Sequence, residues 1–228
     1  MVKRVPMKCK GVDIQLKAVL FDLDGTLIDS KRDIAQSANA ARIHFGFTPL
    51  PDDTIGTFVG LGVMNLLERS IESKDPARLK EAYEIFKKHY RTHCVDFTRP
   101  YPGTFELLEN LKERRVKMGV VSNKPQEFTD LILKKLDLWD FFEVSFGPEA
   151  TVNKKPHPEP LLTALERMKA KPSEGVMIGD SVVDIEAARA AKMLVGVVSH
   201  GYGEREILNA ADPDWLFNSL GEFLEIFT

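Results

Sequence analysis

Cysteine is scarce in this chain, with two residues among 228. Cys9 and Cys94 lie far apart in sequence and form no CxxC or Cys/His pattern, so neither a disulfide framework nor a structural zinc site is expected. We therefore expect the protein to work in a reducing, cytoplasmic environment.

Long apolar runs and a strong charge of either sign are also missing. The N-terminal segment is basic but lacks the continuous apolar stretch of a secretory signal, and no later run is long enough to span a membrane. The formal net charge of −3 favours neither nucleic acid nor a membrane surface as a partner. We interpret Lys3, Arg4, Lys8 and Lys10 as a solvated leader; a basic arm for an acidic partner is the alternative.

Short apolar runs recur along the chain, and each stops at polar residues. AVLF precedes Asp22, VKMGVV precedes Ser122, GVMIG precedes Asp180 and MLVGVV precedes Ser199, while FEVSFG is a weaker fifth run. Segments with apolar residues at helical spacing lie between the runs. This alternation predicts a parallel α/β sheet covered by helices.

The pattern changes between Leu27 and about Phe97, where we find no convincing strand and three helical patterns. Ser30 and Asp33 have the spacing of a capping box that opens the first of these helices. The second helix is expected near residues 64–71, and the third follows Pro76. We predict an inserted helical domain over residues 30–96, between the core segments 1–29 and 97–228.

Polar residues that follow apolar strands are candidates for chemistry, because open parallel sheets bind ligands at the carboxyl ends of their strands. Taken singly, each has an ordinary explanation as a turn, a helix cap or a solvated lysine. Together they offer carboxylates, an ammonium, a hydroxyl and amides, which suit a phosphate held by a hard divalent cation. The candidates are Asp22, Asp24, Ser122, Asn123, Lys155, Asp180 and Asp184.

Four short segments also carry a family resemblance. DLDGT at 22–26, VSN at 121–123, KP at 155–156 and GDSVVD at 179–184 are similar to the four motifs of the haloacid dehalogenase superfamily. The resemblance covers nearly the whole chain. It implies a Rossmann-like core with helices on both faces, and it implies that the inserted helices form a small cap.

The resemblance also implies a role for each motif residue. Asp22 would be the nucleophile that forms an aspartyl phosphate, and Asp24 the general acid and base. Mg²⁺ would be bound by the side chains of Asp22 and Asp180 and by the carbonyl of Asp24. Asp184 would act indirectly, either through a water molecule or by orienting Lys155. The expected donors to the substrate phosphate are Thr26, Ser122, Asn123 and Lys155.

The loops around Gly60, Tyr101 and Gly201 look most like those of phosphoglycolate phosphatases. We therefore expect hydrolysis of a small soluble phosphate ester, with 2-phosphoglycolate as the first choice, by a monomer or a homodimer. A sugar-phosphate mutase like beta-phosphoglucomutase, or a pyrophosphatase, is the alternative. A phospho-accepting receiver domain is a more distant alternative, since such domains lack a large cap and an acid two residues after the acceptor.

Four further positions have open interpretations. Gly60 and Gly62 could present backbone N–H groups to a substrate carboxylate or could simply form the turn before a helix. Arg69 could clamp that carboxylate, although a solvated helix position is the simpler interpretation. Lys192 stands where relatives commonly have glycine, so a left-handed backbone there would be mildly strained.

Overall fold

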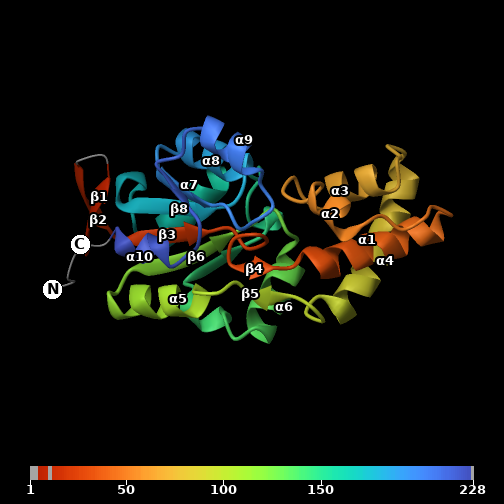
Figure 1. The fold of residues 1–228 in the computed structure, drawn as a ribbon, viewed down its shortest axis with the longest axis horizontal. Helices are drawn as coiled ribbons and strands as arrows, with labels where there is room; N and C mark the ends of the chain where they lie inside the picture. Colours follow the sequence, from red (N-terminus) through yellow and green to blue (C-terminus); the bar gives the residue numbers. More distant parts are fainter. Residues whose placement is uncertain (1–4, 10–11, 227–228) are drawn as a thin grey trace.

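The centre of the molecule is a six-stranded parallel sheet with strand order β10-β9-β8-β3-β6-β7 (Figure 1). The computed structural model describes residues 5–9 and 12–226. The predicted α/β class is confirmed, and five of the strands match the five apolar runs. The short strand β10 was not predicted. The strands are β3 (Ala18–Phe21), β6 (Lys117–Val121), β7 (Val144–Phe146), β8 (Gly175–Gly179), β9 (Leu194–Val198) and β10 (Trp215–Phe217).

Helices cover both faces of the sheet (Figure 1). Alternate residues of β3 point to opposite faces, so Val19 and Phe21 join one apolar core while Ala18 and Leu20 join the other. Helices α5 (Thr104–Glu113), α6 (Gln126–Lys135) and α10 (Glu222–Glu225) pack on the first core. Helices α7 (Glu159–Arg167), α8 (Val182–Ala190) and α9 (Arg205–Ala210) pack on the second. Burial on both faces explains why the strands read as continuous apolar runs.

The N-terminal leader contains an antiparallel hairpin, β1 (Val5–Cys9) and β2 (Val12–Leu16), that the sequence analysis did not predict. The hairpin lies at the end of the molecule opposite to the helical insertion (Figure 1). Lys3, Arg4 and Lys10, which we interpreted as parts of a solvated leader, lie outside the described residues.

The insertion contains the three predicted helices, α1 (Lys31–His44), α3 (Val63–Ser70) and α4 (Pro76–His93), together with a short unpredicted one, α2 (Asp52–Gly56). At the start of α4 the Asp75 side chain accepts a hydrogen bond from the backbone N–H of Arg78. The chain enters and leaves the insertion through two paired two-residue strands, β4 (Ile28–Asp29) and β5 (Arg99–Pro100). The expectation of no strand in this segment was therefore wrong at β4. The division into domains at 29/30 and 96/97 stays a prediction.

The predicted capping box at the start of α1 is wrong. Ser30 occupies the N-cap position, but its hydroxyl makes no cap bond and donates instead to Asp24 Oδ1 at 2.5 Å. The buried carboxylate of Asp33 accepts hydrogen bonds from the backbone N–H of Phe97 and from both the N–H and the hydroxyl of Thr98. Both side chains thus serve partners outside the helix, and these outweigh a local cap.

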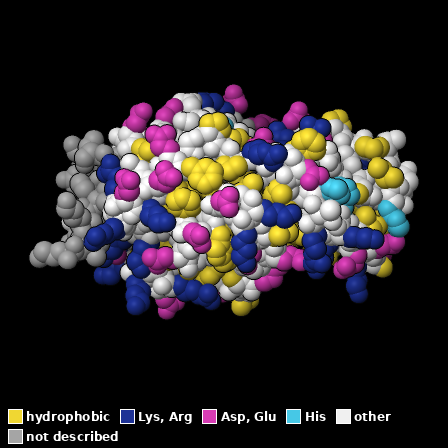
Figure 2. Space-filling view, turned by 90° about the horizontal axis from the view of Figure 1, so that it is seen from below, with side chains coloured by type: hydrophobic (Ala, Val, Ile, Leu, Met, Phe, Trp, Pro, Cys, Tyr) yellow, Lys and Arg dark blue, Asp and Glu magenta, His cyan; other side chains and the backbone are white. Residues whose placement is uncertain are grey.

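Acidic and basic side chains are interspersed on the face seen in Figure 2, in keeping with the near-neutral net charge. Within residues 5–9 and 12–226, no helix is both long and apolar enough to cross a membrane. Lys192, just after α8, does adopt a left-handed backbone with φ 58°, as its departure from the family pattern suggested.

We expect Asp33→Ala to lower the free energy of unfolding by about 2–4 kcal/mol, because it leaves the buried donors of Thr98 without a partner. Urea denaturation followed by circular dichroism measures the change. Asp29→Ala is the matched control, since its exposed carboxylate accepts only a 3.3 Å hydrogen bond from Lys31 N. Equal stability of the two variants would contradict the role of Asp33 in fastening the insertion to the core.

Candidate active site

The first site residues lie in a tight loop that follows β3. The backbone N–H of Asp22 donates to Ile178 O at 2.9 Å, which continues the pairing of β3 with β8 beyond the strand end. The backbone N–H groups of Leu27 and Ile28 turn back to Leu23 O, so the loop curls tightly. The Asp22 and Asp24 side chains are both buried at the end of the sheet.

Glycine is required at position 25 for two reasons. Its φ of +82° is in the left-handed region, and an added Cβ would overlap the carboxylate of Asp180. Thr26 is buried beside the same carboxylate, with its hydroxyl 3.4 Å from Asp180 Oδ1. The loop after β3 and the loop after β8 therefore lie in direct contact.

Three carboxylates meet at this edge of the sheet. Asp22, Asp180 and Asp184 each offer an oxygen, and these oxygens lie within 4.8 Å of one another. Burial raises the pKa of Asp22 to about 6, with Asp184 and Asp24 adding to the effect and Lys155 opposing it. Burial, followed by the charge of Asp22, also raises the pKa of Asp180 well above its ordinary value. A divalent cation would relieve this repulsion.

The carboxylate oxygens at this edge are suitable ligands for such a cation. Asp22 Oδ1 lies 3.1 Å from Lys155 Nζ, yet this buried oxygen accepts no hydrogen bond from the described residues. Asp180 Oδ2 accepts from the backbone N–H of Tyr202 at 2.7 Å. Buried carboxylate oxygens are the hard ligands that Mg²⁺ prefers. The side chains of Asp22 and Asp180 are thus suited to bind a divalent metal ion.

Both oxygens of Asp184 already have partners. Lys155 Nζ donates to Asp184 Oδ1 at 2.6 Å, and the Ser181 hydroxyl donates to Oδ2 at the same distance. Ser181 and Asp184 form the capping box of α8. Asp184 therefore holds Lys155 in place beside Asp22.

Lys155 is almost fully buried between two carboxylates. Burial alone would lower its pKa, but the charges of Asp184 and Asp22 outweigh burial and raise the pKa above the ordinary value. The ammonium group therefore remains charged next to Asp22, where a phosphoryl group would arrive.

The residues after β6 face the same edge. Ser122 and Asn123 are buried, and Ser122 Oγ accepts from the backbone N–H of Lys124 at 3.3 Å. The Asn123 amide donates to Gly60 O and to Lys155 O, both at 2.9 Å. Asn123 thereby links the insertion, the β6 loop and the Lys155 loop. The amide nitrogen of Asn123 is thus already bonded to two carbonyl oxygens. The predicted contact of Asn123 with phosphate stays a prediction.

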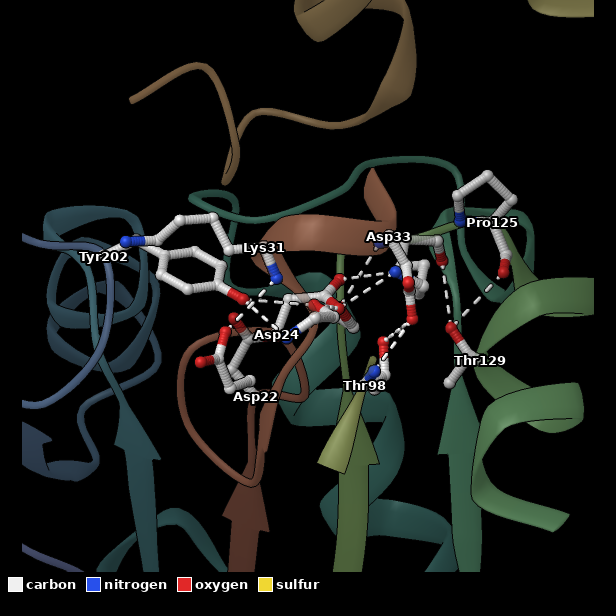
Figure 3. Close-up of polar contacts among 12 residues, drawn as sticks. Asp22, Asp24, Lys31, Asp33, Thr98, Pro125, Thr129 and Tyr202 are labelled. Carbon is white, nitrogen blue, oxygen red and sulfur yellow. Dashed lines mark hydrogen bonds and ion pairs between the residues drawn. The ribbon is translucent and has the colours of Figure 1, made fainter. Parts of the chain in front are cut away.

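Three residues around Asp24 were missed by the sequence analysis. Lys124 is buried with its ammonium nitrogen 2.9 Å from both Asp24 oxygens, and Ser30 donates to the same carboxylate. The Tyr202 hydroxyl accepts from the backbone N–H of Ser30 at 2.9 Å. Figure 3 shows Tyr202 on one side of Asp24, with Asp33 and Thr98 on the other. Lys124 directly follows the VSN motif, and that adjacency is the one sequence signal that could have found it.

A cavity opens above these residues, between the sheet edge and the inserted helices. Its volume is about 130 Å³, which suits a compact substrate. Asp22, Asp24 and Asp180 line its polar end. The apolar part of the wall comes mainly from the insertion and from α6, with Ile34, Val59, Val63, Leu66, Phe86 and Phe128.

Comparison with known proteins assigns this constellation to a family. The family model described as haloacid dehalogenase-like hydrolase matches residues 19–198, which include all the motif residues. The chain therefore belongs to the haloacid dehalogenase-like hydrolases.

More specific relatives are phosphoglycolate phosphatases. The enzyme of Neisseria meningitidis is 38% identical over 218 residues, which cover 92% of this chain and 93% of the relative. That of Aquifex aeolicus is 35% identical and covers 92% of this chain and 96% of the relative. The crystal structure of a predicted phosphoglycolate phosphatase from Haemophilus somnus 129PT has a TM-score of 0.89 at 28% identity, covering 93% of this chain and 98% of that one.

We expect Gly25→Ala to lower kcat/KM by about 10²-fold or more, because the added methyl group displaces the Asp180 carboxylate and strains the loop. Steady-state kinetics with phosphate detection measures the loss. Gly46→Ala is the control, because it also has a positive φ of 79° but no atom within 4 Å of the added Cβ. A Gly25→Ala enzyme as active as the control would contradict the close contact between the two loops.

Proposed function

We propose that the protein is a Mg²⁺-dependent phosphatase that hydrolyses 2-phosphoglycolate through an aspartyl phosphate on Asp22. The observation that carries this proposal is the placement of Asp22 and Asp24 at the polar end of one small cavity, with Lys155 3.1 Å from Asp22. The names of the relatives support the choice of substrate. Family membership favours a hydrolase over the receiver-domain alternative.

In the first step, a carboxylate oxygen of Asp22 forms a bond to phosphorus while the bond from phosphorus to the ester oxygen breaks. Asp24 gives a proton to the departing ester oxygen, which leaves as the alcohol group of glycolate. In the second step, a water molecule attacks phosphorus and gives a proton to Asp24. The bond between phosphorus and Asp22 then breaks, which releases inorganic phosphate and restores both carboxyl groups.

The remaining motif residues serve the phosphoryl group in this proposal. Lys155, Ser122, Thr26 and the Asn123 backbone would donate to the phosphoryl oxygens, while Asp184 positions Lys155. Mg²⁺ would be held by the side chains of Asp22 and Asp180 and by the Asp24 carbonyl, and when bound it would neutralise charge on the phosphate. Residues 30–96 would act as a cap that excludes bulk water from the cavity.

We expect Asp22→Asn to lower kcat by about 10⁴-fold or more, because the amide is no nucleophile and ligates metal poorly. Acid quenching with ³²P-labelled substrate should trap phosphoenzyme in the parent and none in the variant. A variant that still forms phosphoenzyme would refute Asp22 as the acceptor.

Asp24→Asn should lower kcat by about 10²–10⁴-fold, because both steps need proton transfer at this position. The first step should be impaired less with p-nitrophenyl phosphate, whose leaving group departs without a proton. Rapid mixing should therefore show a burst of nitrophenolate in this variant. Parental turnover of 2-phosphoglycolate by Asp24→Asn would exclude the proposed role.

The experiment that tests the whole proposal is phosphate release from a set of substrates, with Mg²⁺ and after chelation by EDTA. We expect the highest kcat/KM for 2-phosphoglycolate among that compound, glucose phosphates, pyrophosphate and a phosphopeptide. Activity should vanish with EDTA and return with Mg²⁺. A preference for a glucose phosphate would instead support the mutase-like alternative, and a preference for the phosphopeptide would contradict the closed cap.

A further inference from the structure

A lysine from the core and a tyrosine from the insertion meet beside Asp24. Lys124 Nζ lies 4.7 Å from the centre of the Tyr90 ring and 2.9 Å from each Asp24 oxygen. Both residues line the cavity. Of the described residues that line the cavity, only Lys124 has a positively charged side chain. An anionic group in the cavity that is not the phosphate would therefore find one cation in the wall.

The hydroxyl of Tyr90 is buried without a partner. It makes no hydrogen bond within the described part of the chain, and Tyr90 is only 1% exposed. Burial raises its pKa well above the ordinary value, and the Asp24 carboxylate adds to that effect, so the hydroxyl keeps its proton. A buried donor without an acceptor destabilises the fold. Such a donor in the wall of a substrate cavity points to a ligand oxygen as its partner.

Tyr90 is held rigidly in place. Its ring packs against Phe86 at 5.2 Å and edge-on against Phe128 of α6 at 5.0 Å between ring centres. Helix α4 of the insertion and helix α6 of the core thus fix the ring together. Removal of the hydroxyl alone leaves these apolar contacts intact.

The other candidate for binding a carboxylate has different partners. Arg69 is exposed, donates to Thr57 O at 2.8 Å and stacks on Phe58 at 4.0 Å. It does not belong to the described lining of the cavity. Its contacts are those of a surface residue that fastens the segment between α2 and α3.

We propose that Lys124 and Tyr90 form a carboxylate-binding pair that selects phosphoesters of small hydroxy acids. An ammonium group has three donors, so two directed at Asp24 leave one for a substrate. That donor and the Tyr90 hydroxyl together supply two hydrogen bonds to a carboxylate. The positive charge also offsets the repulsion between that carboxylate and Asp24. This inference deepens the proposed function and rests on it, because Asp24 must face the leaving group.

Binding of two unreactive probes tests the pair without turnover. 3-Phosphonopropionate carries a carboxylate where 3-hydroxypropylphosphonate carries a hydroxymethyl group, and neither has an ester bond to break. By titration calorimetry with Mg²⁺ present, we expect the parent protein to bind the carboxylate probe about tenfold or more tightly. Equal affinities would overturn the proposal.

Two variants assign the preference to residues. Tyr90→Phe should reduce the ratio of the two affinities about tenfold without lowering thermal stability, since it removes a buried hydroxyl that has no partner in the free protein. Lys124→Met should remove the preference. The matched controls are Tyr83→Phe on the same helix and Lys112→Met, whose ammonium lies 5.2 Å from the Phe141 ring. Both controls should keep the parental ratio.

The pattern across probes separates carboxylate binding from simple positioning of Asp24. If Tyr90→Phe and Lys124→Met lower the affinities for both probes equally, the pair does not recognise the carboxylate and the proposal fails. If Lys124→Met does not fold, the ratio of the two probe affinities in Tyr90→Phe decides whether the proposal stands. A parent that prefers the carboxylate probe but does not hydrolyse 2-phosphoglycolate would support the pair and refute the proposed substrate. A parent that hydrolyses 2-phosphoglycolate without this preference would leave the proposed function standing alone.

Discussion

The site depends on how two buried lysines offset the repulsion among four buried carboxylates. Lys155 lies between Asp22 and Asp184, and Lys124 spans both oxygens of Asp24. An unpaired buried charge would strongly destabilise the fold. Each lysine lowers the free-energy cost of burying the carboxylates beside it. Burial and the neighbouring carboxylates still raise the pKa values of Asp22 and Asp180. A divalent metal ion would offset the remaining negative charge.

The same groups connect the insertion to the core. Asn123 donates to Gly60 O of the insertion, and Asp33 in α1 accepts from Thr98, just before β5. Ser30, just before α1, donates to Asp24. A movement of the insertion would therefore shift the hydrogen bond between Ser30 and Asp24. These contacts thus couple the position of the insertion to the position of Asp24.

Sequence reasoning was reliable where one strong local signal decides the structure. The apolar runs located β3, β6, β7, β8 and β9, and polar residues at their ends converged because parallel strands share one carboxyl edge. It was wrong where tertiary partners compete with local ones: Ser30 and Asp33 have capping-box spacing but bond to Asp24 and Thr98. The hairpin β1–β2 and strand β10 carry weak patterns, since short strands cannot be told from extended loops by periodicity.

Lys124 was missed for a physical reason. A lysine after a strand is usually solvated, and only the three-dimensional placement of Asp24, 100 positions away in sequence, shows that its charge is buried. The residue was close to the motif that carried the resemblance, but its partner could not be inferred from spacing. Tyr90 packs against Phe86 and Phe128, so its ring has the ordinary contacts of an apolar helix face.

In the proposed mechanism, most groups that transfer the phosphoryl group and most groups that select the leaving group come from different parts of the chain. In the proposed mechanism, the loops after β3, β6, β7 and β8 would supply the groups near phosphorus, and all four loops belong to the core. The wall that faces the leaving group is shared, because the insertion contributes Tyr90 while the core contributes Lys124. A change in the insertion could therefore alter which leaving group fits without altering the nucleophile, whereas Lys124 touches both the wall and Asp24. In this proposal, Lys124 would therefore take part both in the choice of substrate and in holding Asp24.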